Sequence, residues 1–422
     1  MPAPIIFPIT RDVLIHKPNF LMVLAPKFYI DPDITKAETL PASFYRNPDV
    51  FEALKTKVFY SSWQWIGDIH QIKEDCNVAP SVLLEGFLTE PILLTKDKNE
   101  KVHCLTNVCS HRGNLVVGQA SKTKKLICGY HGRRFGLDGA FEHMPEFNDA
   151  GDFPRPCDHL HQFPLKQWGP FLFAGLEPSF DFQKVIDTMN ERVGFLPLDE
   201  FKLDKTLGKD YKVNAHWALY CDNYLEGFHI PFVHDDLDEV LDYGNYDTIL
   251  HDHLNLQIGY ADDQTETVFD LPENHIDYGK KIAAYYYWVF PNMMFNFYPW
   301  GCSVNLVQPI STNKTKISFY SYVYDASKLE KGAGAGFRQT PDYYNLDDLF
   351  SEEHLLVRDA ARQWVKRDVS PIIEEYAQKA EFPKQIISGL AEIGSLRTLY
   401  SMKNTGGAGL DQISYWTHHA RN

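Results

Sequence analysis

The sequence lacks long apolar runs, runs of basic residues and the regular cysteine spacing of a disulfide framework. No stretch reaches the roughly 18 consecutive apolar residues that a membrane-spanning helix needs, so no membrane span is expected. The net charge of −15 at pH 7 disfavours nucleic acid and anionic membranes as partners, because both repel an acidic surface. The seven cysteines are odd in number and scattered, which is typical of a protein in the reducing cytoplasm.

The beginning of the chain also lacks the features of a targeting signal. Residues 4–26 are apolar, but charged residues and a proline interrupt them, whereas a signal peptide needs an unbroken apolar centre. We predict an N-terminal extension over residues 1–43, to which the sequence assigns no role. The sequence contains no internal repeat.

The length of 422 residues predicts two or three domains. Apolar residues at helical spacing predict a helix over residues 42–60 that Ser43 caps. Between residues 63 and 175, short β-rich runs alternate with turn residues, which predicts a small all-β domain. Residues 181–324 predict an α+β domain, an antiparallel sheet with helices on one face. Its helices are expected at 183–192 and 217–229, and its strands at 246–260, 282–298, 302–310 and 315–324.

The character of the chain changes after this domain. Residues 332–336 read Gly-Ala-Gly-Ala-Gly, which is typical of a flexible linker. Helical patterns then cover residues 346–367, 368–380 and 383–394. The predicted divisions are the extension 1–43, a helix with the all-β domain over 44–175, the α+β domain over 176–331, a linker over 332–343 and a helical segment over 344–422.

Two short loops in the all-β region each contain one cysteine and one histidine. Sixteen residues separate the segment Cys109-Ser110-His111 from the segment Cys128-Gly129-Tyr130-His131. Two such loops can enclose a [2Fe–2S] cluster, with two thiolates on one iron and two imidazoles on the other. A structural Zn²⁺ site with the same ligands is the alternative, but zinc fingers usually pair Cys with Cys and His with His. The spacing therefore predicts a Rieske-type cluster ligated by Cys109, His111, Cys128 and His131.

A second group of metal-binding residue types lies at 226–234. Glu226 and His229 are three residues apart, so on a helix they share one face. Pro231 disfavours helix at the preceding residue, so the helix should end near His229 and the chain can bring His234 to the same metal. Two histidines and a carboxylate leave positions open on Fe(II) for O₂ and substrate. We predict a mononuclear iron bound by His229 and His234.

The two motifs together resemble those of the α subunits of Rieske non-haem iron oxygenases, over residues 40–335. Gly129 and Arg133 depart from a common form of the second cluster loop, which has Pro and Trp at these positions. The resemblance implies an α+β fold, in which an all-β Rieske domain precedes a helix-grip antiparallel-sheet catalytic domain. An atypical helical segment then ends the chain.

The same resemblance implies a terminal oxygenase that works as a ring of subunits, commonly a homotrimer. An NAD(P)H-dependent reductase or a ferredoxin would supply electrons to the cluster. Glu226 matches the acidic residue that joins a cluster histidine of one subunit to an iron-ligand histidine of the next. The iron would then bind O₂ beside a small organic substrate, and one or both oxygen atoms would be inserted.

Aromatic residues crowd a predicted hairpin over residues 285–300. Strand alternation places Tyr285 and Tyr287 on one face of the sheet, and Tyr286 and Trp288 on the other. Several electron-rich rings around one space suit a quaternary ammonium group, although ordinary sheet core explains the same pattern.

The substrate branch is indicated by two further runs of sequence. Residues 222–234 and the turn Phe290-Pro291-Asn292 look most like the branch that contains choline, glycine-betaine and carnitine oxygenases. We therefore expect hydroxylation or demethylation of a small quaternary ammonium compound. An aromatic ring-hydroxylating dioxygenase is the main alternative.

The C-terminal segment departs from the oxygenase pattern. The family usually takes its third iron ligand from an Asp or Glu on a helix near the C-terminus, but the oxygenase-like sequence stops at residues 331–336. Residues 344–411 resemble the N-terminal helices of acyl-CoA dehydrogenases, in runs such as Leu349–His354 and Leu390–Gly394. This fragment lacks the flavin-binding domain and the catalytic carboxylate of those enzymes. We therefore expect neither FAD nor dehydrogenase activity.

Two interpretations of this segment compete. In the first, the chain is an artificial fusion with a truncated oxygenase, which leaves a Rieske electron-transfer protein without oxygenase activity. In the second, the helix over residues 346–367 takes the missing place and Asp347 or Asp348 completes the iron site. Residues 395–405 depart from the dehydrogenase pattern as a shifted reading frame would, which favours the first interpretation.

Overall fold

The computed structural model describes residues 27–73, 75–228, 241–261 and 267–332, together with scattered residues between 360 and 389. The chain divides into two compact units, residues 1–339 and residues 340–422. Four predicted site residues lie outside the described residues: His229, His234, Asp347 and Asp348.

Two short helices and a π-helical turn precede the all-β domain. They are α1 (Ala42–Arg46), α2 (Pro48–Leu54) and η2 (Lys55–Phe59). The prediction of one helix over residues 42–60 with Ser43 as its cap is wrong. Pro48 disfavours helix at Asn47, and the Asn47 side chain instead caps α2 by accepting the Asp49 N–H at 2.8 Å.

The predicted all-β domain is confirmed. The described part of residues 63–175 contains antiparallel sheets with the strand orders β1-β10-β9, β2-β3-β4-β8 and β5-β6-β7. The strands are β1 (Trp63–Asp68), β2 (Val78–Leu83), β3 (Glu90–Lys96), β4 (Val102–Thr106), β5 (Leu126–Ile127), β6 (Arg134–Phe135), β7 (Phe141–His143), β8 (Gln162–Phe163), β9 (Leu165–Trp168) and β10 (Phe171–Gly175).

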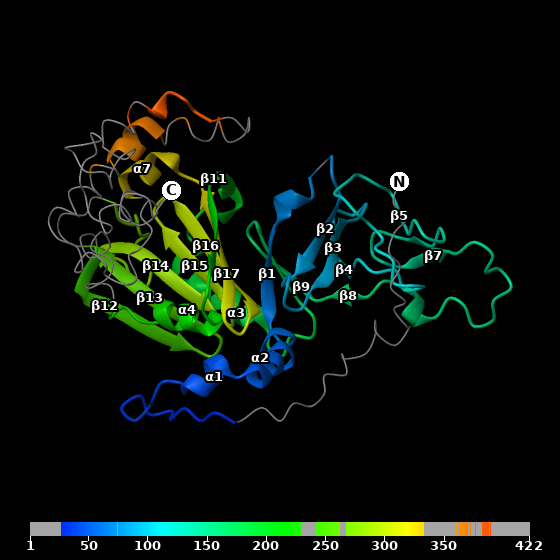
Figure 1. Cartoon of the computed structure of the whole chain (residues 1–422), viewed down its shortest axis with the longest axis horizontal. Coiled ribbons are helices and arrows are strands. Elements are labelled where there is room, and N and C mark those ends of the chain that lie inside the picture. Colours follow the sequence, from blue (N-terminus) through cyan, green and yellow to red (C-terminus); the bar gives the residue numbers. More distant parts are fainter. Residues whose placement is uncertain are drawn as a thin grey trace, which may run out of the picture. The chain divides into compact units, whose positions relative to one another are not determined.

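The next domain is built on a seven-stranded antiparallel sheet, drawn in green to yellow in Figure 1, with the order β11-β17-β16-β15-β14-β13-β12. Its strands are β11 (Lys202–Val213), β12 (Leu241–His251), β13 (Leu254–Ala261), β14 (Ile282–Val289), β15 (Met293–Tyr298), β16 (Gly301–Ser311) and β17 (Lys314–Val323). The single strand predicted at 246–260 is wrong, because a turn at Asp252 and His253 divides it into β12 and β13.

Helices α3 (Phe182–Val193), α4 (Trp217–Tyr224) and α7 (Ala326–Gly332) accompany this sheet. The helix predicted at 183–192 lies within α3. The helix predicted at 217–229 is wrong at its C-terminal end, because α4 ends at Tyr224 and is closed by the bond from the Leu225 N–H to the Cys221 carbonyl.

The two faces of the sheet pack into different cores. Tyr285 and Tyr287 share one core with Met189 of α3. On the other face, Trp288 packs against the cluster that contains Trp217 of α4. The predicted alternation along β14 is confirmed. Helices contact both faces, so the expectation of helices on one face alone is wrong.

Beyond residue 340, little of the predicted helical segment can be compared with the structure. The described residues there include a π-helical turn over Val365–Val369. Most of the helices predicted at 346–367, 368–380 and 383–394, and the linker after Gly332, lie outside the described residues. Among the residues that are described, no helix has the length and apolarity to cross a bilayer.

Candidate functional site

Two loops of the all-β domain repeat one backbone pattern. In the first, the Gly113 N–H donates to the Cys109 carbonyl at 3.0 Å, and in the second the Gly132 N–H donates to the Cys128 carbonyl at 3.0 Å. Both glycines have φ of +70°, a conformation that residues with a Cβ rarely adopt. The sequence thus folds each Cys-containing segment into the same tight turn.

The donor groups of these loops are segregated by type. The Cys109 and Cys128 residues are only 1% and 2% exposed, whereas His111 is half-buried and His131 is exposed. The two imidazole rings are adjacent, with their centroids 4.8 Å apart. Burial raises the pKa of the Cys109 thiol to about 11, and the neighbouring Cys128 thiol acts in the same direction. Metal binding would therefore displace a proton from this thiol.

This donor set fits a two-metal cluster better than a single ion. A zinc site needs its four ligands about 2.0–2.3 Å from one point. Paired thiols inside and paired imidazoles outside instead suit two irons with different ligands, as in a Rieske cluster.

Asp158 connects both loops. Its backbone carbonyl accepts hydrogen bonds from the Ser110 hydroxyl at 2.8 Å and from the Arg133 guanidinium at 3.1 Å. Its carboxylate accepts a second bond from Arg133 at 2.7 Å. A further bond runs from the Asn114 amide to the Cys128 sulfur at 3.7 Å. Sequence reasoning missed Asp158, because it is far from the motif, and noted Arg133 only as a departure from the common loop.

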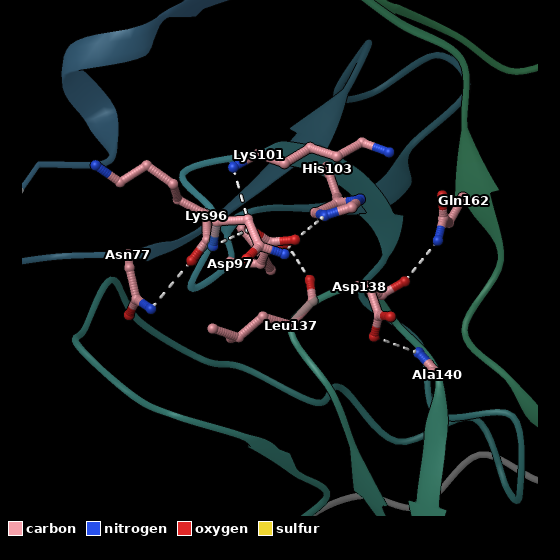
Figure 2. A network of polar contacts seen from close by, with 11 residues as sticks. Asn77, Lys96, Asp97, Lys101, His103, Leu137, Asp138, Ala140 and Gln162 are labelled. Atoms are coloured by element: carbon pink, nitrogen blue, oxygen red, sulfur yellow. Dashed lines mark hydrogen bonds and ion pairs between the residues drawn. The ribbon is translucent and has the colours of Figure 1, made fainter.

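Polar contacts join the β6–β7 hairpin, which follows the second loop, to the four-stranded sheet, as Figure 2 shows. At the β3–β4 turn, the Asp97 carboxylate lies 3.0 Å from the His103 ring and accepts the Lys101 N–H at 3.1 Å. The Thr95 hydroxyl next to this turn donates to the Leu137 carbonyl of the β6–β7 turn. These contacts hold the turn between β6 and β7 against the four-stranded sheet. The first loop follows β4 of that sheet.

The second predicted metal site is described only in part. Glu226 lies beyond the end of α4, and its carboxylate accepts the Phe228 N–H. The prediction that Glu226 lies on a helix, sharing a face with His229, is therefore wrong, because α4 ends at Tyr224. His229 and His234 lie outside the described residues, as do Asp347 and Asp348.

Polar and aromatic groups gather where α4 meets the sheet, just before Glu226. The Tyr224 hydroxyl donates to the Asn296 side chain at 2.7 Å, and the Gln257 amide donates to the Tyr224 carbonyl at 2.7 Å. The Tyr246 hydroxyl donates to Gln257 at 3.1 Å. Burial, Tyr286 and the charge of Glu226 all raise the pKa of Tyr246.

Tyr286 and Tyr298 add two rings to the same face. Their centroids are 5.9 Å apart in an edge-to-face arrangement. Burial raises the pKa of Tyr286 to about 12, so its phenol stays neutral. Sequence alternation identified Tyr286, but it missed Tyr224 and Tyr246, whose approach depends on the packing of α4.

His216 caps the N-terminus of α4. Its Nδ1 accepts the Ala218 N–H at 3.3 Å, and the rings of Phe44, Tyr45 and Phe51 surround it. Burial lowers the pKa of His216 to about 4, so the ring is neutral at physiological pH. This histidine has a structural role at the start of the helix that leads to Glu226.

Comparisons with known families match each part of the chain. The family model for the Rieske [2Fe-2S] domain matches residues 62–164, and that for the ring hydroxylating alpha subunit (catalytic domain) matches residues 201–366. The model for the acyl-CoA dehydrogenase N-terminal domain matches residues 351–418. Both predicted resemblances are confirmed. The catalytic-domain match runs past the expected end at 331–336, so it includes Asp347 and Asp348.

Two proteins similar in sequence to this chain are monooxygenases by name. Choline monooxygenase, chloroplastic, of Arabidopsis thaliana is 28% identical over 315 residues, which cover 70% of this chain and 71% of that protein. The carnitine monooxygenase oxygenase subunit of Escherichia coli (strain K12) is 26% identical over 284 residues, covering 67% of this chain and 72% of that subunit.

Solved structures share the fold. The quaternary ammonium Rieske monooxygenase CntA in complex with an inhibitor aligns with a TM-score of 0.57 at 20% identity, over 70% of this chain and 80% of that chain. Naphthalene 1,2-dioxygenase from Rhodococcus sp. aligns with a TM-score of 0.57 at 18% identity, over 74% and 80%.

Proposed function

This chain belongs to the α subunits of the Rieske non-haem iron oxygenases, and we propose that it hydroxylates or demethylates a small quaternary ammonium compound. It is an oxidoreductase whose Rieske domain binds a [2Fe–2S] cluster and whose catalytic domain uses a mononuclear iron. Rieske oxygenases take electrons from a reductase or ferredoxin and use O₂. When bound, the cluster supplies electrons one at a time and the mononuclear iron activates O₂.

The cluster ligands in this proposal are Cys109, Cys128, His111 and His131. The two buried thiols would hold one iron and the two more exposed imidazoles the other. The exposed ring of His131 would be the part of this site that a neighbouring subunit can approach. We infer a homotrimer from the resemblance to the Rieske oxygenases, which commonly work as rings of three subunits.

The mononuclear iron in this proposal is held by His229 and His234. Glu226 accepts a hydrogen bond from one iron-ligand histidine and holds its tautomer, because a carboxylate is the usual partner of such an N–H. The position of Glu226 directly after α4 supports this role, since α4 is anchored on the sheet by Tyr224. An NAD(P)H-dependent reductase or a ferredoxin is the inferred electron donor, and a reducing cytoplasm suits the seven scattered cysteines.

One observation carries the substrate assignment: neutral tyrosine rings gather on the sheet face beside Glu226. Tyr286 and Tyr298 lie edge to face. They pack in one cluster with Tyr246 and with Tyr224, which is two residues before Glu226. Such rings attract a trimethylammonium group through their negative faces, and each contact contributes roughly 0.5–2 kcal/mol. The names of the choline and carnitine monooxygenase relatives agree with this chemistry.

The assignment is tested by comparing choline with its uncharged carbon isostere 3,3-dimethylbutan-1-ol. The two have the same shape, so only the charge distinguishes them. With iron-loaded protein and a reductase, we expect product and coupled O₂ consumption from choline, carnitine or betaine, and at least about tenfold weaker kcat/KM for the isostere. Product from simple arenes alone would favour a ring-hydroxylating dioxygenase. Cluster reduction without O₂ consumption on any substrate would favour a Rieske electron-transfer protein.

A further inference from the structure

We propose that Arg133 raises the reduction potential of the Rieske cluster and that the Asp158 carboxylate limits this effect. The inference rests on the proposed cluster ligands but not on the proposed substrate. It concerns a charge placed where the common form of the second loop has an uncharged tryptophan.

The Arg133 side chain is buried in an aromatic enclosure. The residue is only 1% exposed, and its guanidinium lies 5.8, 5.0 and 5.6 Å from the ring centroids of Phe135, Phe141 and Phe153. An arginine keeps its proton at any physiological pH. Because the rings exclude water, this fixed positive charge is weakly screened and acts strongly on nearby groups.

The same charge lies beside the cluster loops. The Cys128 N–H donates to the Arg133 carbonyl at 2.9 Å, so the arginine is part of the second loop. The Arg133 guanidinium and the Ser110 hydroxyl donate to the same Asp158 carbonyl, at 3.1 and 2.8 Å, so the charge also lies beside the loop residue between Cys109 and His111. A buried positive charge at this point favours any negative charge added between the two loops.

Cluster reduction adds one such charge. The donor loses one electron and the cluster gains it, while Arg133 exchanges neither an electron nor a proton. The guanidinium therefore stabilises the reduced cluster more than the oxidised one. Removing the charge should lower the reduction potential.

Asp158 has two separable roles. Its carboxylate pairs with Arg133 at 2.7 Å and accepts the Arg155 N–H at 2.8 Å, so it partly cancels the positive charge. Its backbone carbonyl, which any residue supplies, ties Ser110 and Arg133 together. The change Asp158→Asn removes the negative charge and keeps the backbone contacts. It should therefore shift the potential upward, opposite to the loss of Arg133.

The test is a redox titration of the full-length, cluster-loaded protein, followed by electron paramagnetic resonance. At a fixed applied potential, Arg133→Met should lower the ratio of reduced to oxidised cluster at least tenfold. For a one-electron couple this corresponds to about 59 mV. Arg133→Lys keeps a charge and should stay close to the native value. Asp158→Asn should shift the ratio upward. Arg134→Met removes an exposed charge one residue away and is the matched control, with no shift expected.

Cluster content is measured first, as iron and sulfide per chain. Should Arg133→Met fail to load, Arg133→Trp supplies an uncharged residue that the common loop tolerates. Shifts of Arg133→Met and Asp158→Asn in the same direction, or an Arg133→Met value within threefold of native, would overturn the proposal. Native protein without the Rieske resonance signal would instead overturn the ligand assignment on which it rests.

Discussion

Cys109 and Gly113 in one loop make the same backbone hydrogen bond as Cys128 and Gly132 in the other. No such repeat surrounds Glu226 among the described residues. The groups near Glu226 come from elements far apart in the sequence, through bonds such as those of Tyr224 to Asn296 and of Tyr246 to Gln257. The cluster site therefore depends on local turns, whereas the second site depends on the packing of α4 against the sheet. Changes that affect one region should leave the other largely intact.

The strongest test of this independence removes one cluster thiol. Cys128→Ser should lose the whole cluster, because a serine oxygen is a poor replacement for a thiolate on iron. Iron content should fall from about three per chain to about one, the mononuclear iron alone. Metal and sulfide analysis checks this. Retention of the resonance signal at native intensity would contradict the assignment of Cys128.

The converse change removes a proposed ligand of the mononuclear iron. His234→Ala should lower iron from about three to about two per chain and abolish O₂-coupled product formation, with the cluster spectrum unchanged. Native protein with only about two irons would support the truncated, electron-transfer interpretation. His143→Ala, at an exposed position of β7, serves as the control histidine.

Acid should weaken the α4 region through His216. The pKa of this ring is about 4 in the folded protein because of burial, against 6.5 when exposed. Between these values the unfolded chain binds the extra proton, so the free energy of unfolding falls as pH falls from 6.5 to 4. The full effect is roughly 3 kcal/mol.

Chemical denaturation at several pH values measures this slope. His216→Asn keeps a capping side chain without a titrating ring and should flatten the dependence. Asp222 has the opposite effect on the free energy of unfolding. Its pKa is raised in the folded protein, because burial outweighs the opposing hydrogen bond from the Tyr45 hydroxyl. The comparison with His216→Asn therefore isolates the histidine. An unchanged slope in this variant would contradict the assignment.

The smallest expected effects, on KM and on the free energy of unfolding, come from changes at two neighbouring tyrosines of β14. Tyr286→Leu should raise KM for a trimethylammonium substrate about tenfold and leave the uncharged isostere unaffected. Tyr285→Phe should leave both KM values unchanged but lower the free energy of unfolding by about 1 kcal/mol, because it removes the 3.1 Å bond to Asp277. Equal effects of both changes on KM would remove the distinction between the two faces.

The features that sequence predicted well are local. The spacing of Cys109, His111, Cys128 and His131 lies within two short loops, so it predicted the Rieske domain, which the family match confirms, without tertiary structure. The four ligands themselves stay a prediction. The alternation of Tyr285 and Tyr286 depends only on strand geometry. Both predictions needed no knowledge of distant residues.

The features that sequence missed depend on competing local signals or on partners that are far apart in the chain. The end of α4 at Tyr224 was missed because Pro231 gave only an outer limit, and the capping bonds that end the helix earlier carry no clear sequence signal. Asp158 was missed because its partner Arg133 lies 25 residues away in the chain. Pro48 and Asn47 did carry a signal for the break between α1 and α2, but the apolar periodicity across them was given more weight.

The paired loops have a consequence for metal loading. Each loop offers one thiol and one imidazole, so with the proposed ligands each iron is held by both loops at once. The cluster would act as a double cross-link between the segment after β4 and the hairpin that carries β6. Loading is then expected to be all-or-none, without a stable one-iron form, and the segment between the loops should resist proteolysis only in the loaded protein.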